Sequence, residues 1–143
     1  MGLFDPISTA ITGVDASETW LNAVSDNIAN MNDVTSTSQG AYQERYVEMQ
    51  AVPGQAGGTG SGSNGAIGSG VAVTGIALGS PAGVEESDPT SPLADKNGMV
   101  RAANIDLGQQ MTNMMLAQRG YEANLATISQ AEGAYKAALG LQV

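Results

Sequence analysis

Residues 107–139 read LGQQMTNMMLAQRGYEANLATISQAEGAYKAAL and repeat apolar side chains at alternating steps of four and three residues. Eight of the ten positions on this repeat are apolar, and the other two are Gln118 and Glu132. An apolar period near 3.5 residues is typical of a helix that a second helix covers. The stretch therefore predicts a long C-terminal helix over residues 104–139, with Asn104 or Asp106 as its cap.

A matching repeat lies at the other end of the chain, where eight of nine positions from Leu3 to Met31 are apolar. Asp5 and Pro6 favour a helix start, because Asp caps free N–H groups and Pro has its φ preset for the first helical position. We expect a helix from about Pro6 to Met31. The two terminal helices are expected to pair as a coiled coil, because each stripe needs a facing helix.

Gln118 and Glu132 interrupt the C-terminal stripe, and two interpretations remain open. A straight helix drifts against a strict heptad, so the covered side can move onto the neighbouring Ala117 and Ala131. Alternatively, the two polar side chains set the register of contacts between subunits.

The middle of the chain, residues 34–103, is expected to form a small β-rich part. Residues 41–51 and 70–78 alternate in polarity and predict strands. Residues 54–70 are rich in Gly and Ser and predict a flexible tract, because so little apolar area cannot offset the chain entropy.

Two short motifs stand between that tract and the C-terminal helix. Asp95–Gly98 reads DKNG and predicts a tight hairpin turn, since Asn-Gly tolerates positive φ. We expect this turn to join short strands near Leu93 and Met99–Val100. Glu85, Glu86 and Asp88 form an acidic run that is most simply a solvated loop.

The expected fold is therefore mainly α with a small β part. Residues 1–33 and 104–143 form the coiled-coil inner domain, and residues 34–103 form the outer part between them.

The composition excludes several classes of function. The net charge is −9 with only five Lys and Arg, which argues against binding nucleic acid or anionic lipid. Neither His nor Cys is present, so the commonest catalytic bases, nucleophiles and zinc ligands are missing. We expect no enzymatic activity, no catalytic residue, no cofactor and no metal. No positive n-region with an apolar run is found, and no stretch is apolar enough to cross a bilayer, so neither a cleaved signal peptide nor membrane insertion is expected.

Three stretches toward the two ends of the chain resemble the bacterial flagellar rod and hook proteins, and two stretches between them are most similar to the proximal-rod proteins of that group. The motifs S-D-N-I-A-N and Y-x-A-N are the most specific to these axial proteins. The matching stretches are Met1–Asp5, Ser25–Asn30, Gly70–Ile76, Pro92–Val100 and Arg119–Asn124. The motif residues carried over are Ser25, Asn27, Ile28, Ala29, Asn30, Tyr121, Ala123 and Asn124.

This resemblance implies a structural subunit of the rod, the hollow drive shaft of the flagellar basal body. It implies export by the flagellar type III apparatus and self-assembly through the terminal helices around a central channel. The implied neighbours are the rod proteins FlgB, FlgF and FlgG and the rod adaptor FliE. The alternatives are a helical adaptor that binds one partner helix, or another flagellar axial protein such as FlgB.

The side chains expected at subunit interfaces are the apolar positions of the two stripes. They are Ile7, Val14, Leu21, Val24, Ile28, Leu107, Met111, Met114, Tyr121, Leu125, Ile128, Tyr135 and Leu139.

Overall fold

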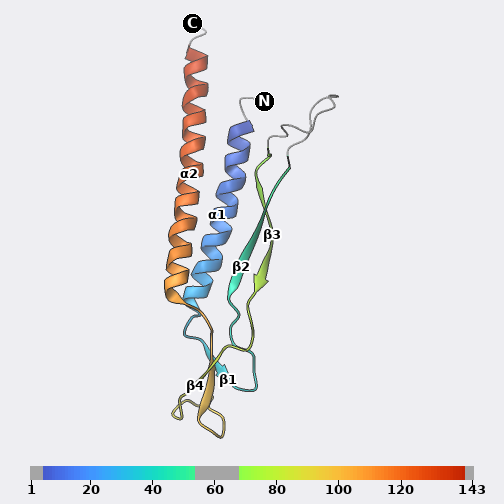
Figure 1. The fold of residues 1–143 in the computed structure, drawn as a ribbon. Helices are drawn as coiled ribbons and strands as arrows, with labels where there is room; N and C mark the ends of the chain where they lie inside the picture. Colours follow the sequence, from blue (N-terminus) through green and yellow to red (C-terminus); the bar gives the residue numbers. More distant parts are fainter. Residues whose placement is uncertain (1–4, 54–67, 141–143) are drawn as a thin grey trace. The chain divides into compact units, whose positions relative to one another are not determined.

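A computed structural model describes residues 5–53 and 68–140 and shows a mixed α/β architecture (Figure 1). Two helices stand at the ends of the chain and five short strands lie between them in sequence. The order is α1 (Asp5–Ala29), β1 (Val34–Ser36), β2 (Arg45–Ala51), β3 (Val71–Leu78), β4 (Val84–Ser87), β5 (Met99–Ala102) and α2 (Leu107–Gly140). The two predicted helices and the strands at residues 41–51 and 70–78 are confirmed in outline.

The ends of both helices follow from polar side chains that bond to the backbone. α1 stops at Ala29 because Asn30 turns its Nδ2 back to the Asp26 carbonyl at 2.8 Å, and Asp33 N then bonds to the Asn30 carbonyl at 3.0 Å. α2 begins at Leu107 because Asp106 Oδ1 accepts a hydrogen bond from Gln109 N at 2.9 Å. Asp106, and not Asn104, is therefore the cap.

The described chain divides into two compact units, and each is considered by itself. The first unit contains α1 up to Thr19, the chain from Glu48 to Gly75 and α2 from Ala117 onward. Its core consists of small side chains, because Ala10, Ala16 and Ala117 are all at least 96 % buried. Ser17 lies at its edge, with its Oγ bonded to the Gly13 carbonyl at 2.8 Å.

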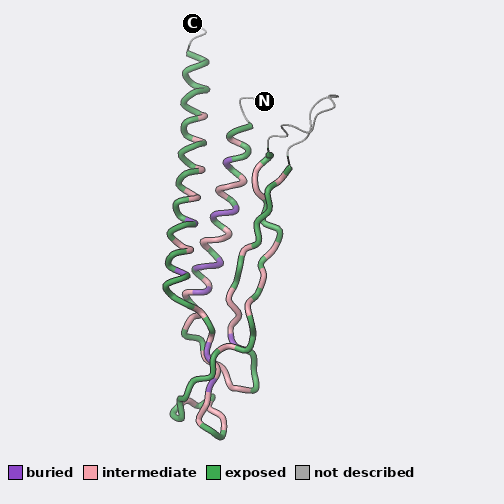
Figure 2. Tube along the Cα trace, in the orientation of Figure 1, coloured by how far each residue is buried: buried purple, intermediate pink, exposed green. Residues whose placement is uncertain are grey.

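The second unit contains residues 20–47 and 76–116 and includes a three-stranded sheet in the order β1-β5-β4. The central strand β5 is antiparallel to both neighbours, with Val34 and Val84 each opposite Ala102. Val100 and Ala102 on β5 are buried, as are Ala23 and Val24 of α1 (Figure 2). β2 and β3 form a separate two-stranded ribbon.

Three expectations for the middle of the chain are wrong in detail. Residues near Leu93 do not form a strand, because β5 pairs with β1 and β4 instead. The acidic Glu85 and Glu86 lie in strand β4 and not in a loop, with Arg101 of β5 opposite Glu85. Residues 34–36 form β1, although no strand was expected there. Most of the Gly/Ser tract, residues 54–67, lies outside the described residues.

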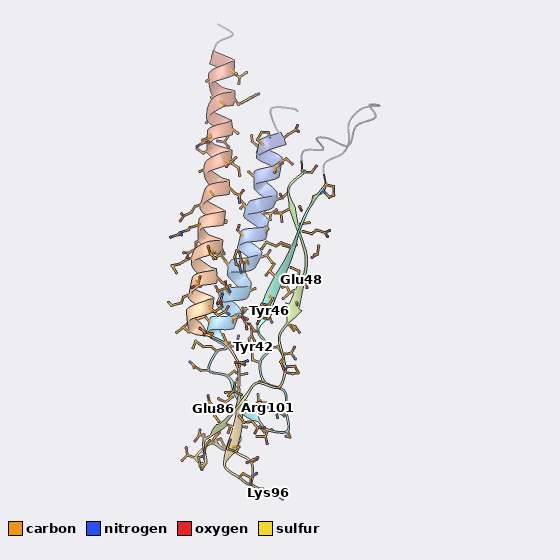
Figure 3. All side chains as sticks on the ribbon, in the orientation of Figure 1. Tyr42, Tyr46, Glu48, Glu86, Lys96 and Arg101 are labelled. Carbon is orange, nitrogen blue, oxygen red and sulfur yellow. The ribbon has the colours of Figure 1, made fainter. Side chains whose placement is uncertain are left out.

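The predicted turn at Asp95–Gly98 is confirmed. Gly98 adopts a φ of 75° and its N–H bonds to the Asp95 carbonyl at 3.0 Å. The Asp95 carboxylate accepts hydrogen bonds from Asn97 N at 2.8 Å and Met99 N at 3.0 Å. These bonds hold the pKa of Asp95 below its ordinary value of 3.8, with the bond from Met99 as the largest cause. Lys96 lies at the tip of this turn (Figure 3).

Candidate subunit interface

The most buried residues of α2 are the small Ala117 and the polar Gln110, and its large apolar Met114, Tyr121 and Ile128 are half-buried. Ala117 is fully buried, whereas the neighbouring Gln118 is exposed. Ala131 is half-buried, whereas Glu132 is exposed. Within the chain, the covered side therefore follows Ala117 and Ala131, as expected from the drift of a straight helix against a heptad.

Glycine residues allow α1 and α2 to approach closely inside the first unit. A Cβ placed on Gly13 would lie 2.6 Å from the Asn124 side chain, and one on Gly120 would lie 3.2 Å from Ser17 Oγ. Asn124 is itself held by a bond from its Nδ2 to the Gly120 carbonyl at 2.8 Å. These small-residue contacts let two antiparallel helix segments come close together.

The residues expected at subunit interfaces fall into three groups. Val24 is the one fully buried member, at 1 % exposure. Seven are half-buried, namely Ile7, Val14, Leu21, Ile28, Met114, Tyr121 and Ile128. Five on α2 are exposed, namely Leu107, Met111, Leu125, Tyr135 and Leu139.

The residues expected at subunit interfaces do not include two further exposed apolar side chains on α2. In the second unit, Met115 and Leu116 are about as exposed as Leu107 and Met111, and the four form what we call the methionine patch. In the first unit, the exposed large apolar side chains of α2 are Leu125, Tyr135 and Leu139, which we call the C-terminal patch. Isolated exposed apolar residues are normal, whereas contiguous apolar surface is typical of an interaction site, and Leu107, Met111 and Met115 recur at four-residue steps along one side of α2.

A buried polar cluster connects α1, α2 and the chain before β2 in the second unit. Asn27 and Gln110 are each only 1 % exposed, and Asn27 Nδ2 donates to Gln110 Oε1 at 3.1 Å. Asn27 also pairs with both backbone groups of Arg45, since its Oδ1 accepts from Arg45 N at 2.8 Å and its Nδ2 donates to Arg45 O at 3.0 Å. The carboxamide thus occupies the place that a neighbouring strand would fill.

Glu44 completes this cluster. Its Oε1 accepts from Gln110 Nε2 at 2.6 Å, and its Oε2 accepts from the Tyr46 hydroxyl. The hydrogen bond to Glu44 is the main reason that the pKa of Tyr46 is raised, with burial and the Glu44 charge adding to it. Figure 3 labels Tyr42 and Tyr46, which precede and follow Glu44 in the sequence.

The family-motif residues play different parts. Asn27 joins the cluster, Asn30 ends α1 and Asn124 contacts Gly13, whereas Ser25, Ala29 and Ala123 are exposed. Sequence reasoning found Asn27 through the motif and missed Gln110 and Glu44. A polar residue on the covered side of a helix carries no periodic signal, so spacing alone does not identify it.

The described residues hold no group of three acidic or other ligating side chains placed to bind a metal ion. In the same part of the chain, neither helix combines the length and apolarity that a membrane crossing requires.

Comparisons with known proteins match the chain along nearly its whole length. Residues 96–141 match the family described as flagellar basal body rod FlgEFG protein C-terminal. A flagellar basal-body rod protein FlgC of Borreliella burgdorferi is 30 % identical, over 99 % of this chain and 98 % of its own. The FlgC protein of Salmonella typhimurium is 31 % identical over 90 % of each chain, and that of Agrobacterium fabrum is 33 % identical over 88 % of each.

Proposed function

This chain belongs to the FlgC family of flagellar basal-body rod proteins, and we propose that it assembles into the rod through the apolar side chains of its terminal helices. It is a structural subunit of the basal-body rod, located in the flagellar basal body and associated with other rod components. The proximal part of the rod is the assigned position, because the compared relatives carry the name FlgC and not FlgB.

The observation that carries this proposal is that α2 uses some residues for contacts inside the chain and leaves several large apolar side chains exposed. Contacts inside the chain use Ala117, Gly120 and Asn124, while the methionine patch and the C-terminal patch are exposed. Burying apolar area contributes about 25 cal/mol per Å², so a few such side chains supply several kcal/mol per contact. Methionine suits a helix that meets inequivalent neighbours, because its unbranched side chain adapts to irregular surfaces.

We assign the thirteen stripe residues to contacts within and between subunits. The helices of residues 1–33 and 104–143 pair as a coiled coil and form the inner domain around the export channel. Residues 34–103 form the outer part. Small residues at the contacts of Gly13 and Gly120 support close helix pairing, and the resemblance to axial proteins supports the channel-lining position.

The neighbours that we assign are the rod proteins FlgB, FlgF and FlgG and the adaptor FliE. Export by the flagellar type III apparatus without a cleaved signal peptide delivers the chain to the cell envelope. The role is mechanical, because a stiff tube of repeated subunits transmits torque without chemistry. The lack of His and Cys in the sequence supports a non-enzymatic role.

The experiment compares two substitutions on α2 in a strain that lacks the native gene. Leu125→Asp places a charge in the C-terminal patch, where the side chain is 42 % exposed, and Gln130→Asp places the same charge at another exposed position. We expect Leu125→Asp to leave the purified chain folded but to abolish rod assembly and swimming. Gln130→Asp is expected to swim. Normal swimming with Leu125→Asp would contradict the proposal, and basal bodies that lack this chain would favour a helical adaptor.

A further inference from the structure

The hydrogen bonds of the buried cluster in the second unit run in one direction. Each carboxamide donates only from its NH₂ group and accepts only at its oxygen. Asn27 uses its whole hydrogen-bonding capacity, since Nδ2 makes two donations and Oδ1 accepts twice, from Arg45 N at 2.8 Å and from the Tyr42 hydroxyl at 3.4 Å. Rotating this carboxamide by half a turn would set NH₂ against the Arg45 N–H and oxygen against the Arg45 carbonyl.

The Arg45 backbone sets this direction for Asn27, and Glu44 at the far end of the cluster imposes the same direction on Gln110. An ionised carboxylate accepts hydrogen bonds but cannot donate them, so Glu44 Oε1 faces the NH₂ of Gln110. The Gln110 oxygen is then turned toward Asn27 and accepts from its Nδ2. That leaves Asn27 Oδ1 for the N–H of Arg45. The four groups form one chain from the Arg45 backbone through Asn27 and Gln110 to the Glu44 carboxylate.

We propose that Glu44 is a positioning residue that fixes the orientation of the Gln110 amide, so that Gln110 and the Arg45 backbone hold the Asn27 carboxamide in the same direction. By this relay it holds Arg45 against α1 at the point where β2 begins. The relay joins the end of α1, the first turns of α2 and the start of β2 into one cooperative block. This inference concerns the folding of the second unit and does not depend on rod assembly.

The geometry favours this relay over the nearby ion pair as the fixing contact. Arg45 NH1 lies 2.6 Å from Asp26 Oδ2, but the two side chains are 42 % and 50 % exposed. Exposed ion pairs contribute little because water screens them. Asn27 and Gln110 are each 1 % exposed, so a donor or acceptor that loses its partner there cannot bond to water instead.

The test reverses the direction of the relay in the full-length chain. Asn27→Asp removes the donor and sets a carboxylate oxygen against two acceptors, Arg45 O and Gln110 Oε1. We expect the folded-to-unfolded ratio to fall roughly tenfold to a hundredfold in urea unfolding followed by circular dichroism. Adding Glu44→Gln supplies a donor at position 44, so the Gln110 amide can rotate and donate to the new carboxylate. We therefore expect the double variant to recover part of the lost ratio, at least threefold.

The control is Asn27→Asp combined with Glu48→Gln, which removes the same charge from an exposed position of β2. Recovery with Glu44→Gln and not with Glu48→Gln supports the relay. Equal stability of the two double variants overturns it.

A second measurement uses variants that keep the native Asn27. In nuclear magnetic resonance spectra, Glu44→Leu leaves Gln110 without an acceptor at position 44 and should shift or broaden the side-chain NH₂ signals of Gln110 and Asn27, and Glu48→Leu should leave them unchanged. Unchanged Asn27 signals with Glu44→Leu would overturn the proposal even if both double variants failed to fold.

Discussion

Gly13 of α1 and Asn124 of α2 lie so close that a single added Cβ atom at Gly13 would sit 2.6 Å from the Asn124 amide group. Gly13 lies within the helix, where glycine costs about 0.5–1 kcal/mol relative to alanine. The Asn124 side chain occupies the space that a larger residue would need, which explains why glycine stands at this helical position. Gly133 on α2 has no such explanation in the described part of the chain, residues 5–53 and 68–140, where no atom lies within 4 Å of an added Cβ at this position.

We predict opposite effects of alanine at these two helical glycines. Gly13→Ala should lower the free energy of unfolding by about 1–3 kcal/mol, because the new methyl group forces Asn124 and its bond to the Gly120 carbonyl to shift. Gly133→Ala should raise it by about 0.5–1 kcal/mol, because only helix propensity changes. Urea unfolding of both variants measures the difference. A stabilised Gly13→Ala would show that the helices do not approach closely at this point.

Thr12 attaches the start of β3 to α1 in the first unit. Its Oγ1 accepts a hydrogen bond from Val71 N at 3.1 Å and donates to the Thr9 carbonyl at 2.7 Å. Thr12→Val should lower the free energy of unfolding by about 1 kcal/mol, because the Val71 N–H loses its partner. Thr19→Val is the matched control, since the Thr19 hydroxyl donates to the Asp15 carbonyl of its own helix. Faster amide exchange at Val71 in Thr12→Val alone would confirm the attachment, and equal exchange in both variants would contradict it.

Gly83 is required by both its backbone and its surroundings. Its φ is 57°, and an added Cβ would collide with the Ala102 carbonyl oxygen and with Ala41 Cβ. Gly83→Ala should lower the free energy of unfolding by about 1–3 kcal/mol. Gly75→Ala is the control, because the nearest atom to its added Cβ is 3.8 Å away and its φ is not positive. Thermal unfolding of the pair measures the effect, and a Gly83→Ala chain as stable as Gly75→Ala would refute it.

The ionisation of Asp95 makes the stability of the second unit depend on pH in the acid range. Its folded pKa lies below the ordinary value of 3.8, so its stabilising contribution is complete above that value and is lost as the pH falls through the folded pKa. We expect the amide signals of Asn97 and Met99 to move together with Asp95 ionisation, at a pH below 3.8. Asp95→Asn should abolish this transition. A transition that persists in Asp95→Asn would assign it to another carboxyl group.

The regular parts of the fold are predictable from local sequence, and the pairing of distant parts is not. Apolar spacing and capping predicted both helices, and Asp95–Gly98 predicted its turn, because each signal acts over a few residues. The partners of β5 were not predictable, because β1 and β4 are short, β1 is half-buried and β4 exposed, and nothing in Val34–Ser36 alternates strongly. Strand partners at such sequence separation are chosen by tertiary packing.

The apolar stripe names the interface residues, including Leu107, Met111 and Leu125, and that assignment stays a prediction. Spacing alone could not show that Ala117 and Gly120 provide contacts within the chain. Small residues add little to an apolar pattern, although they decide how closely two helices approach. Asn27 and Gln110 are polar and buried, so hydrophobic periodicity misses them altogether.

Cross-linking from position 125 inside purified basal bodies tests the central claim most directly. The native chain contains no cysteine, so Leu125→Cys or Gln130→Cys carries a benzophenone label at one defined position. We predict that the label at position 125 joins this chain to a second rod subunit on irradiation, and that the label at position 130 does so far less. Assembled basal bodies in which position 125 gives no cross-link to any rod component would contradict the account.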